Sequence, residues 1–160
     1  MGIVRPHLWY HSQAEEAANF YASVIPNSQV TNVIKAPAGV NAAEGAAFIV
    51  EFTLDGMPVT AMSAGPGFTL DESFSMVLDC ETQEEVDHYW EALLADGGEP
   101  SQCGWLKDRY GLSWQVVPTS LDSLLFSEDT EASARATQAM YAMQKLDLPA
   151  IQAAYDGVPV

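Results

Sequence analysis

The alternation of apolar and polar positions predicts a similar series of elements twice: a strand and a helix, followed by three strands in the first half and by two in the second. In the first half we expect strands at 5–10, 29–35, 48–54 and 57–64, with a helix between the first two. In the second half we expect a strand at 73–78, a helix at about 83–95 and a pair of strands within 102–118. Glu15-Glu16 and Phe20-Tyr21 of the first helix match Glu84-Glu85 and Tyr89-Trp90 of the second, which indicates an internal repeat.

Short motifs predict where these elements begin and end. Ser12 and Thr82 each stand three residues before a glutamate, which is the spacing of a helix-capping box. Asp55-Gly56 predicts a tight hairpin turn, and Gly111 supplies the positive φ that the second hairpin needs. The small residues at 36–45 predict a loop.

The part of the chain after Pro118 is predicted to be helical. We expect a short helix at 121–126, a longer one from a cap at Thr130 to about 143, and a last one from Asp147 to 157. Alanine and methionine form the apolar stripe of the longer helix, a composition typical of packing against the domain or a second subunit.

The strand pair within 102–118 carries candidate chemistry. Its second strand places Trp114 on one face and Ser113 and Gln115 on the other. One interpretation is a strand that buries Trp114 and presents the two polar residues to a cavity; the other is a hairpin whose polar residues face water. At the turn we expect an ion pair between Lys107 and Asp108, the alternative being that both line the mouth of the cavity.

Five stretches resemble the PhnB-like proteins. They are HLWYHSQAEEAANFY at 7–21, FTLDGMPVTAMSAGP at 52–66, CETQEEVDHYW at 80–90, CGWLKDRYGLSWQVVP at 103–118 and QAMYAMQKLDLPAIQAAYDG at 138–157. These proteins carry the family name 3-demethylubiquinone-9 3-methyltransferase. They form a branch of the glyoxalase/bleomycin-resistance/dioxygenase (vicinal oxygen chelate) superfamily.

The resemblance implies an α+β fold of two βαβββ modules, each curling a mixed sheet into a half-barrel that borders a cavity. The modules would occupy about 3–64 and 73–118 within residues 1–118. Residues 119–160 would form a helical extension of the same domain. The resemblance, the sheet edges and the apolar helix faces also lead us to expect a homodimer.

The net charge of the chain limits which classes of partner it is expected to bind. The sequence has 22 acidic and 6 basic residues among 160, a net charge of −16. Such a surface repels phosphate backbones and anionic lipids, so we expect neither nucleic acid nor a membrane as partner. Residues 1–5 lead into a strand without a secretory signal, and Cys80 and Cys103 are expected to be reduced. A cytoplasmic location is therefore expected.

In metal-dependent members of the superfamily, His and Glu side chains from four strands bind the ion. By resemblance, Gln115 stands where the last strand has Glu, and Ser73 stands at a position that is commonly His. The strand at 57–64 has no His, Glu, Asp or Cys, and the first strand offers Pro6 or, with a shift of one residue, His7. A stable site needs three or four ligands. We therefore expect no metal and no other cofactor, the alternative being a weakly held divalent ion.

The other pocket candidates are aromatic. Trp90 and Trp114 are expected in the core, and Trp9 and Trp105 at the pocket. His7 is read either as a hydrogen-bonded interior histidine or as a pocket residue. The predicted ligand pocket comprises His7, Trp9, Ser73, Trp105, Ser113 and Gln115.

Three functions fit this sequence. The first is binding of a small molecule in a metal-free cavity, and the second is a metal-dependent isomerase, lyase or dioxygenase that uses His7 and Gln115. The third is a structural or interaction role of the acidic surface. The small number of metal ligands favours the first. No glycine-rich first turn of an adenosylmethionine-binding sheet is present, so the sequence does not support the methyltransferase name of the family.

Overall fold

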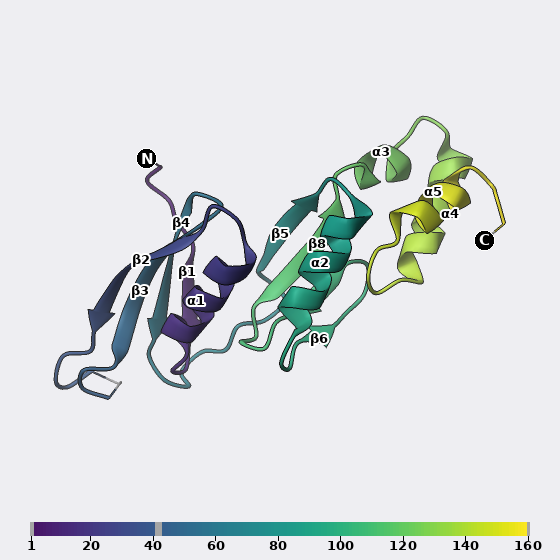
Figure 1. Ribbon diagram of the computed structural model, residues 1–160. Coiled ribbons are helices and arrows are strands. Elements are labelled where there is room, and N and C mark those ends of the chain that lie inside the picture. The colour runs from purple at the N-terminus through teal and green to yellow at the C-terminus, as the bar shows by residue number, and fades with distance from the viewer. Residues whose placement is uncertain (1, 41–42, 160) are drawn as a thin grey trace. The chain divides into compact units, whose positions relative to one another are not determined.

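The chain divides into two compact units, residues 1–71 (unit 1) and 72–160 (unit 2). The computed structural model describes residues 2–40 and 43–159 (Figure 1). Each unit has the order strand, helix and three strands, and each forms a four-stranded sheet. Three further helices follow in unit 2. The structure therefore confirms the predicted α+β fold of two βαβββ modules with added C-terminal helices.

Unit 1 contains one helix and sheet 1. Its elements are β1 (His7–Tyr10), α1 (Ala14–Val24), β2 (Gln29–Lys35), β3 (Ala47–Leu54) and β4 (Met57–Ser63). The strand order is β1-β4-β3-β2, with β1 parallel to β4 and the other pairs antiparallel. The predicted loop at 36–45 joins β2 to β3, and residues 41 and 42 of it lie outside the described residues.

Helix α1 packs on one face of sheet 1 through small residues and one aromatic side chain. Ala14, Ala17 and Ala18 are fully buried, which lets the helix approach the strands closely. Tyr21 is also fully buried, and its ring lies 6.3 Å from that of Phe52 on β3. The face of sheet 1 away from α1 has no helix within unit 1, and we call it the helix-free face.

The start of α1 differs from the prediction. The residue before the helix is Gln13, whose side chain makes no capping hydrogen bond, so the predicted Ser12 cap is wrong. The hydroxyl of Ser63, on β4, instead accepts a hydrogen bond from the N–H of Ala14 at 3.0 Å. A buried side chain from a distant strand thus satisfies one of the free N–H groups that begin every helix.

Unit 2 repeats the arrangement in sheet 2. Its strands and first helix are β5 (Ser75–Cys80), α2 (Gln83–Leu94), β6 (Glu99–Pro100), β7 (Trp105–Lys107) and β8 (Ser113–Pro118). The order β5-β8-β7-β6, with β5 parallel to β8, corresponds strand by strand to that of sheet 1. Helix α2 contacts β5, β7 and β8 and so covers one face. The Thr82 cap is confirmed, because its hydroxyl accepts from the N–H of Glu85 at 3.2 Å.

Two predicted boundaries in unit 2 are wrong. Strand β5 begins at Ser75, so Ser73 lies in the preceding turn and is exposed. The longer tail helix is capped by Asp129 and not by Thr130: a carboxylate oxygen of Asp129 accepts from the N–H of Ala132 at 3.0 Å. Aspartate is as good a cap as threonine, and only the backbone geometry decides which of two neighbours takes the position.

The C-terminal helices pack as one cluster within unit 2. They are α3 (Leu121–Leu125), α4 (Thr130–Tyr141) and α5 (Leu148–Tyr155), the last capped by Asp147 as predicted. Their core contains Leu146 and Ile151, both fully buried, and Val117 of β8 packs against it. No helix in the described residues is long and apolar enough to cross a membrane. The assignment of both modules and the extension to one domain stays a prediction.

Candidate functional site

The helix-free face of sheet 1 carries the unit 1 residues that the sequence singled out. Leu8 and Tyr10 are buried, and the residues that alternate with them on β1, His7 and Trp9, point to the opposite face. His7 is exposed, which does not fit the interpretation of an interior histidine. The indole N–H of Trp9 donates to the carbonyl of Gly65 at 2.9 Å, so Trp9 offers a ligand its ring and not its donor.

Thr60 lies at the centre of this face. On β4 it is paired in register with His7 on one side and Glu51 of β3 on the other. Its side chain is buried, with 4% of the residue exposed. Its hydroxyl oxygen has no hydrogen-bond partner among the described residues. A hydroxyl that loses water without gaining a partner is uncommon in folded proteins and is destabilising.

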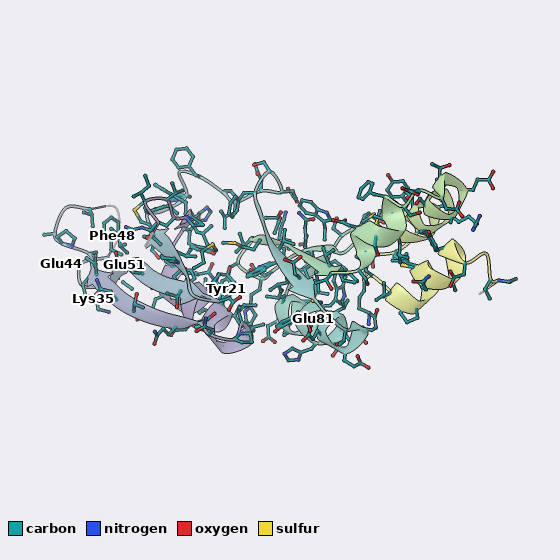
Figure 2. All side chains as sticks on the ribbon, turned by 90° about the horizontal axis from the view of Figure 1, so that it is seen from above. Tyr21, Lys35, Glu44, Phe48, Glu51 and Glu81 are labelled. Atoms are coloured by element: carbon teal, nitrogen blue, oxygen red, sulfur yellow. The ribbon has the colours of Figure 1, made fainter. Side chains whose placement is uncertain are left out.

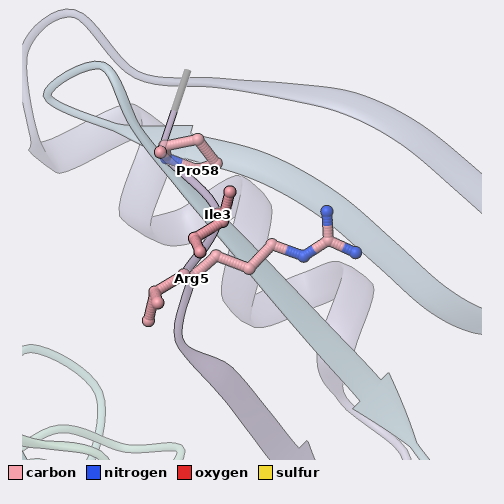
Figure 3. Close-up of a pocket in the computed structure, with 5 residues that line it drawn as sticks. Ile3, Arg5 and Pro58 are labelled. Carbon is pink, nitrogen blue, oxygen red and sulfur yellow. The ribbon is translucent and has the colours of Figure 1, made fainter.

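A groove of about 320 Å³ runs beside Thr60. Its walls come from β2, β3, β4 and the segment before β1: Arg5, Thr31, Glu51, Phe52, Thr53, Pro58, Val59 and Thr60. A smaller hollow of about 110 Å³ lies next to it, between residues 2–5 and Pro58. Figure 3 shows the side chain of Arg5 extended away from Ile3 and Pro58, and Figure 2 shows Glu51 at the end of sheet 1 that also carries Lys35 and Phe48.

The face of sheet 2 opposite α2 carries the unit 2 candidates. Trp114 is 2% exposed and lies on the α2 side, as predicted, while Ser113 and Gln115 lie on the other. The amide N–H of Gln115 donates to the hydroxyl of Ser75 at 2.9 Å, and Trp105 is the register partner of Gln115 on β7. Ser73, in the turn before β5, lies outside the sheet.

Ser113 repeats the state of Thr60. It is 1% exposed, and its hydroxyl has no partner among the described residues. It is paired in register with Ser75 on β5 and Lys107 on β7. The N–H of Ala64 donates to Tyr10 and the N–H of Thr119 donates to Cys80, so the matching registers place Gln115 opposite Thr60 and Ser113 opposite Pro58. Each unit thus buries one unpaired hydroxyl on the strand that is parallel to its first strand, two residues apart in this alignment.

The turn before β8 differs from the expected ion pair. Asp108 is 3% exposed, and its carboxylate accepts hydrogen bonds from the N–H of Tyr110, the N–H of Leu112 and the indole of Trp114. Lys107 instead forms a 2.6 Å ion pair with Glu72. Asp108 therefore holds the turn together from inside and does not line a pocket.

Cys80 offers no activated nucleophile. Cys80 and Cys103 are both free thiols. Burial, and after it the carboxylates of Glu85 and Asp79, raise the pKa of Cys80 to about 11. A thiol with so high a pKa stays protonated at neutral pH, and the thiolate is the reactive form.

The donor set does not fit a catalytic metal ion. In the described residues, no group of three or more His, Cys, Asp or Glu side chains is placed to hold one. The predicted ligand positions carry an exposed His7, a turn residue Ser73 and an amide Gln115 already bonded to Ser75. Adenosylmethionine does not fit either, because each sheet has one parallel and two antiparallel pairs and not the parallel sheet that typically holds this cofactor.

The sequence profile of the family described as 3-demethylubiquinone-9 3-methyltransferase matches residues 3–117. The chain belongs to this family. The match ends at the last strand of sheet 2, so α3, α4 and α5 lie outside it. This confirms the PhnB-like resemblance and the place in the glyoxalase superfamily. A search among curated proteins finds no match.

Solved structures agree with this assignment. A PhnB protein from Bacillus cereus is 29% identical, with 73% of this chain and 99% of that chain covered and a TM-score of 0.67. A protein from Pseudomonas aeruginosa is 16% identical, with 74% and 98% covered and a TM-score of 0.61. The fosfomycin resistance protein FosX from Listeria monocytogenes, complexed with Mn(II) and sulfate, is 14% identical, with 76% and 92% covered and a TM-score of 0.52. The last two show a shared fold only.

The sequence missed two residues of the groove in unit 1. Thr60 and Arg5 were not singled out, because a threonine on a strand and an arginine just before one are ordinary. The signal that could have found Thr60 is the internal repeat, since aligning the turn at Gly111 on the turn at Gly56 places Thr60 opposite Gln115.

Proposed function

We propose that this PhnB-like protein binds a small molecule on the faces of its two sheets that lie away from α1 and α2, without a bound metal ion. The observation that carries the proposal is the pair of buried, unpaired hydroxyls, Thr60 and Ser113. Each unpaired buried hydroxyl destabilises the fold by about 1–3 kcal/mol. A ligand that hydrogen-bonds to either hydroxyl removes that penalty, so the apo protein stores part of the binding free energy at these two places.

The surrounding side chains support a ligand and not a cation as the missing partner. A hydroxyl and an amide can each donate and accept, whereas neither brings the negative charge that a divalent ion requires. Trp9 and Trp105 add apolar ring surface to the same faces. Small-molecule sites commonly combine aromatic walls with a few polar groups in this way.

Native mass spectrometry of the purified protein, combined with elemental analysis, tests the proposal. We expect a small molecule to accompany the protein and metal to remain well below one ion per chain. Thr60→Val and Ser113→Ala remove the hydroxyls with little change in volume. We expect both to weaken ligand binding and neither to destabilise the apo protein. Stoichiometric metal, or unchanged binding in both variants, would contradict the proposal.

Gln115→Glu tests the metal-free part directly. A carboxylate at this place adds one negative ligand, so we expect measurable but weak binding of Ni²⁺ or Co²⁺ in a titration. The binding stays weak because Ser73 and the strand β4 supply no further charged ligand. Tight metal binding by the unchanged protein would show that the ligand positions are wrongly assigned.

We also infer that the protein forms a homodimer. The edge strand β5 exposes Val77 (53%), and the turn before it exposes Phe74 (43%), so this edge of sheet 2 presents apolar surface. Analytical ultracentrifugation at micromolar concentration should give twice the chain mass of 17.3 kDa. Sedimentation at the chain mass itself would contradict the inference.

A further inference from the structure

Each unit places two opposite charges beside its unpaired hydroxyl, but with the signs exchanged. In unit 2 the cation is Lys107 on β7, and its partner Glu72 precedes β5. In unit 1 the anion is Glu51 on β3, and its partner Arg5 precedes β1. Glu51 and Lys107 are the register partners of Thr60 and Ser113 respectively, so each charged pair lies beside the unpaired hydroxyl of its own unit.

The two pairs differ in how completely they satisfy each other. In unit 2 the ammonium and carboxylate are 2.6 Å apart, a full hydrogen bond. In unit 1 the guanidinium nitrogen of Arg5 and the Glu51 oxygen are 3.9 Å apart, beyond hydrogen-bond distance. The side chain of Arg5 is 58% exposed, and it makes no hydrogen bond in the described part of the chain. The other carboxylate oxygen of Glu51 accepts a hydrogen bond from the side-chain amide of Asn32 at 3.0 Å.

We propose that the groove beside Thr60 binds a small zwitterion, a molecule that carries a carboxylate or similar oxyanion and an ammonium group. The guanidinium of Arg5 takes the oxyanion, and the free oxygen of Glu51 takes the ammonium group. This proposal rests on the proposed function, whose ligand class it specifies for unit 1. The closed Lys107–Glu72 pair leaves unit 2 without such a site.

The charges of the protein disfavour ligands that carry only a negative or only a positive group. A plain anion would approach a chain with a net charge of −16, which repels it. A plain cation is attracted by that field but meets Arg5 in the groove. A zwitterion has no net charge, and each of its ends meets an opposite charge. The groove volume of about 320 Å³ lies at the small end of ligand sites, roughly 300–1,000 Å³.

Thr60 gives the site its third contact. Its hydroxyl is buried beside the groove and has no hydrogen-bond partner among the described residues. A threonine side chain rotates between staggered rotamers, and this rotation exchanges the positions of its hydroxyl and methyl groups. A ligand with a hydrogen-bonding group near its centre lets the hydroxyl rotate outward and gain a partner. Loss of this contact weakens binding without changing the charge preference.

NMR titration of the ¹⁵N-labelled full chain tests the proposal with three probes of equal length: 4-aminobutyrate, butyrate and butylammonium. Glycine and 6-aminohexanoate vary the separation of the two charges. We expect a zwitterion of the series to shift the amide signals of Glu51 and Thr60. Its dissociation constant should be at least tenfold lower than that of butyrate or butylammonium.

Matched variants separate direct contact from the general field. Arg5→Gln and Lys107→Gln each remove one positive charge, yet only Arg5→Gln should weaken zwitterion binding, by tenfold or more. Glu51→Gln should weaken it equally, and Thr60→Val by a smaller factor. The inference would be overturned if butyrate bound as tightly as the best zwitterion, or if Arg5→Gln and Lys107→Gln weakened zwitterion binding equally. It would also be overturned if no zwitterion shifted the amide signals. If another small molecule still accompanies the purified protein, the proposed function survives that result; if none does, both fall.

Discussion

Asp108 ties three parts of the turn between β7 and β8 to one carboxylate. One oxygen accepts from the N–H of Tyr110 at 2.8 Å and of Leu112 at 3.1 Å, and the other accepts from the indole of Trp114 at 2.8 Å. A buried carboxylate is tolerated only where such donors replace water. Asp108 thus provides the acceptor that the buried indole N–H of Trp114 needs.

Variants of Trp114 should separate the ring from its N–H group. Trp114→Ala is expected to lower the free energy of unfolding by about 3–5 kcal/mol, because it empties a buried site. Trp114→Phe keeps most of the apolar volume but removes the indole hydrogen bond to Asp108, a loss of about 1–3 kcal/mol. Urea unfolding measures both. A Trp114→Ala protein as stable as the unchanged one would contradict the burial of this face.

At this scale the sequence predicted side-chain faces better than side-chain partners. The period of two along β8 sets which residues face the helix, so the burial of Trp114 followed from the pattern. The partner of Lys107 did not, because the turn conformation directs Asp108 inward and brings Glu72 within 2.6 Å. The spacing of apolar residues predicts neither effect.

The N-terminus of α1 is an element whose stability rests on a distant strand. Ser63→Ala is expected to lower the free energy of unfolding by about 0.5–2 kcal/mol, because the buried N–H of Ala14 loses its acceptor. Ser12→Ala is the matched control and should change it by less than about 0.5 kcal/mol. Thermal unfolding of both variants checks this. A larger loss for Ser12→Ala would restore the cap that the sequence predicts.

Helix α2 holds the C-terminal extension partly by charge. A hydrogen bond from Lys145, and then one from Gln83, keeps the pKa of Asp87 below its usual 3.8. Since the folded-state pKa is the lower one, this stabilisation is complete above 3.8 and is lost as pH falls through the folded-state pKa. The pair is about 40% exposed on each side, with side-chain exposures of 37% and 43%.

Lys145→Gln should therefore lower the free energy of unfolding at neutral pH by only about 0.2–1 kcal/mol, as expected for a surface pair. The difference from the unchanged protein should vanish as pH falls well below 3.8. Lys35→Gln removes the same charge elsewhere on the acidic surface and corrects for the general field. Urea unfolding across this pH range decides it, and a difference that persists in acid would exclude Asp87 as the partner.

At the scale of the whole molecule, the internal repeat could be predicted from the sequence. The residue contacts that form the candidate site could not. The match of Phe20-Tyr21 with Tyr89-Trp90 fixed the correspondence of the two units, and both Tyr21 and Trp90 are buried. The pairing of Thr60 with His7 and Glu51 depends on contacts across three strands. Such contacts, and the difference between a 2.6 Å and a 3.9 Å ion pair, are decided by tertiary packing.

Leu146, between α4 and α5, packs the extension against the rest of unit 2. It is fully buried, and its carbonyl accepts from the side chain of Gln83 at 2.9 Å. A Cβ added to Gly104 would lie 2.9 Å from the side chain of Leu146 and from the carbonyl of Val116, at a backbone φ of +85°. The close approach of these two segments therefore requires glycine.

A double-mutant cycle measures this packing. Leu146→Ala should lower the free energy of unfolding by about 2–5 kcal/mol, and Gly104→Ala should also be destabilising through the clash and the positive φ. In the double variant the side-chain part of the clash is absent, so its loss should be smaller than the sum of the two single losses. The carbonyl contact and the φ remain, so the double variant stays less stable than Leu146→Ala alone. Strictly additive losses, or a harmless Leu146→Ala, would show that residues 119–160 do not share the core of unit 2.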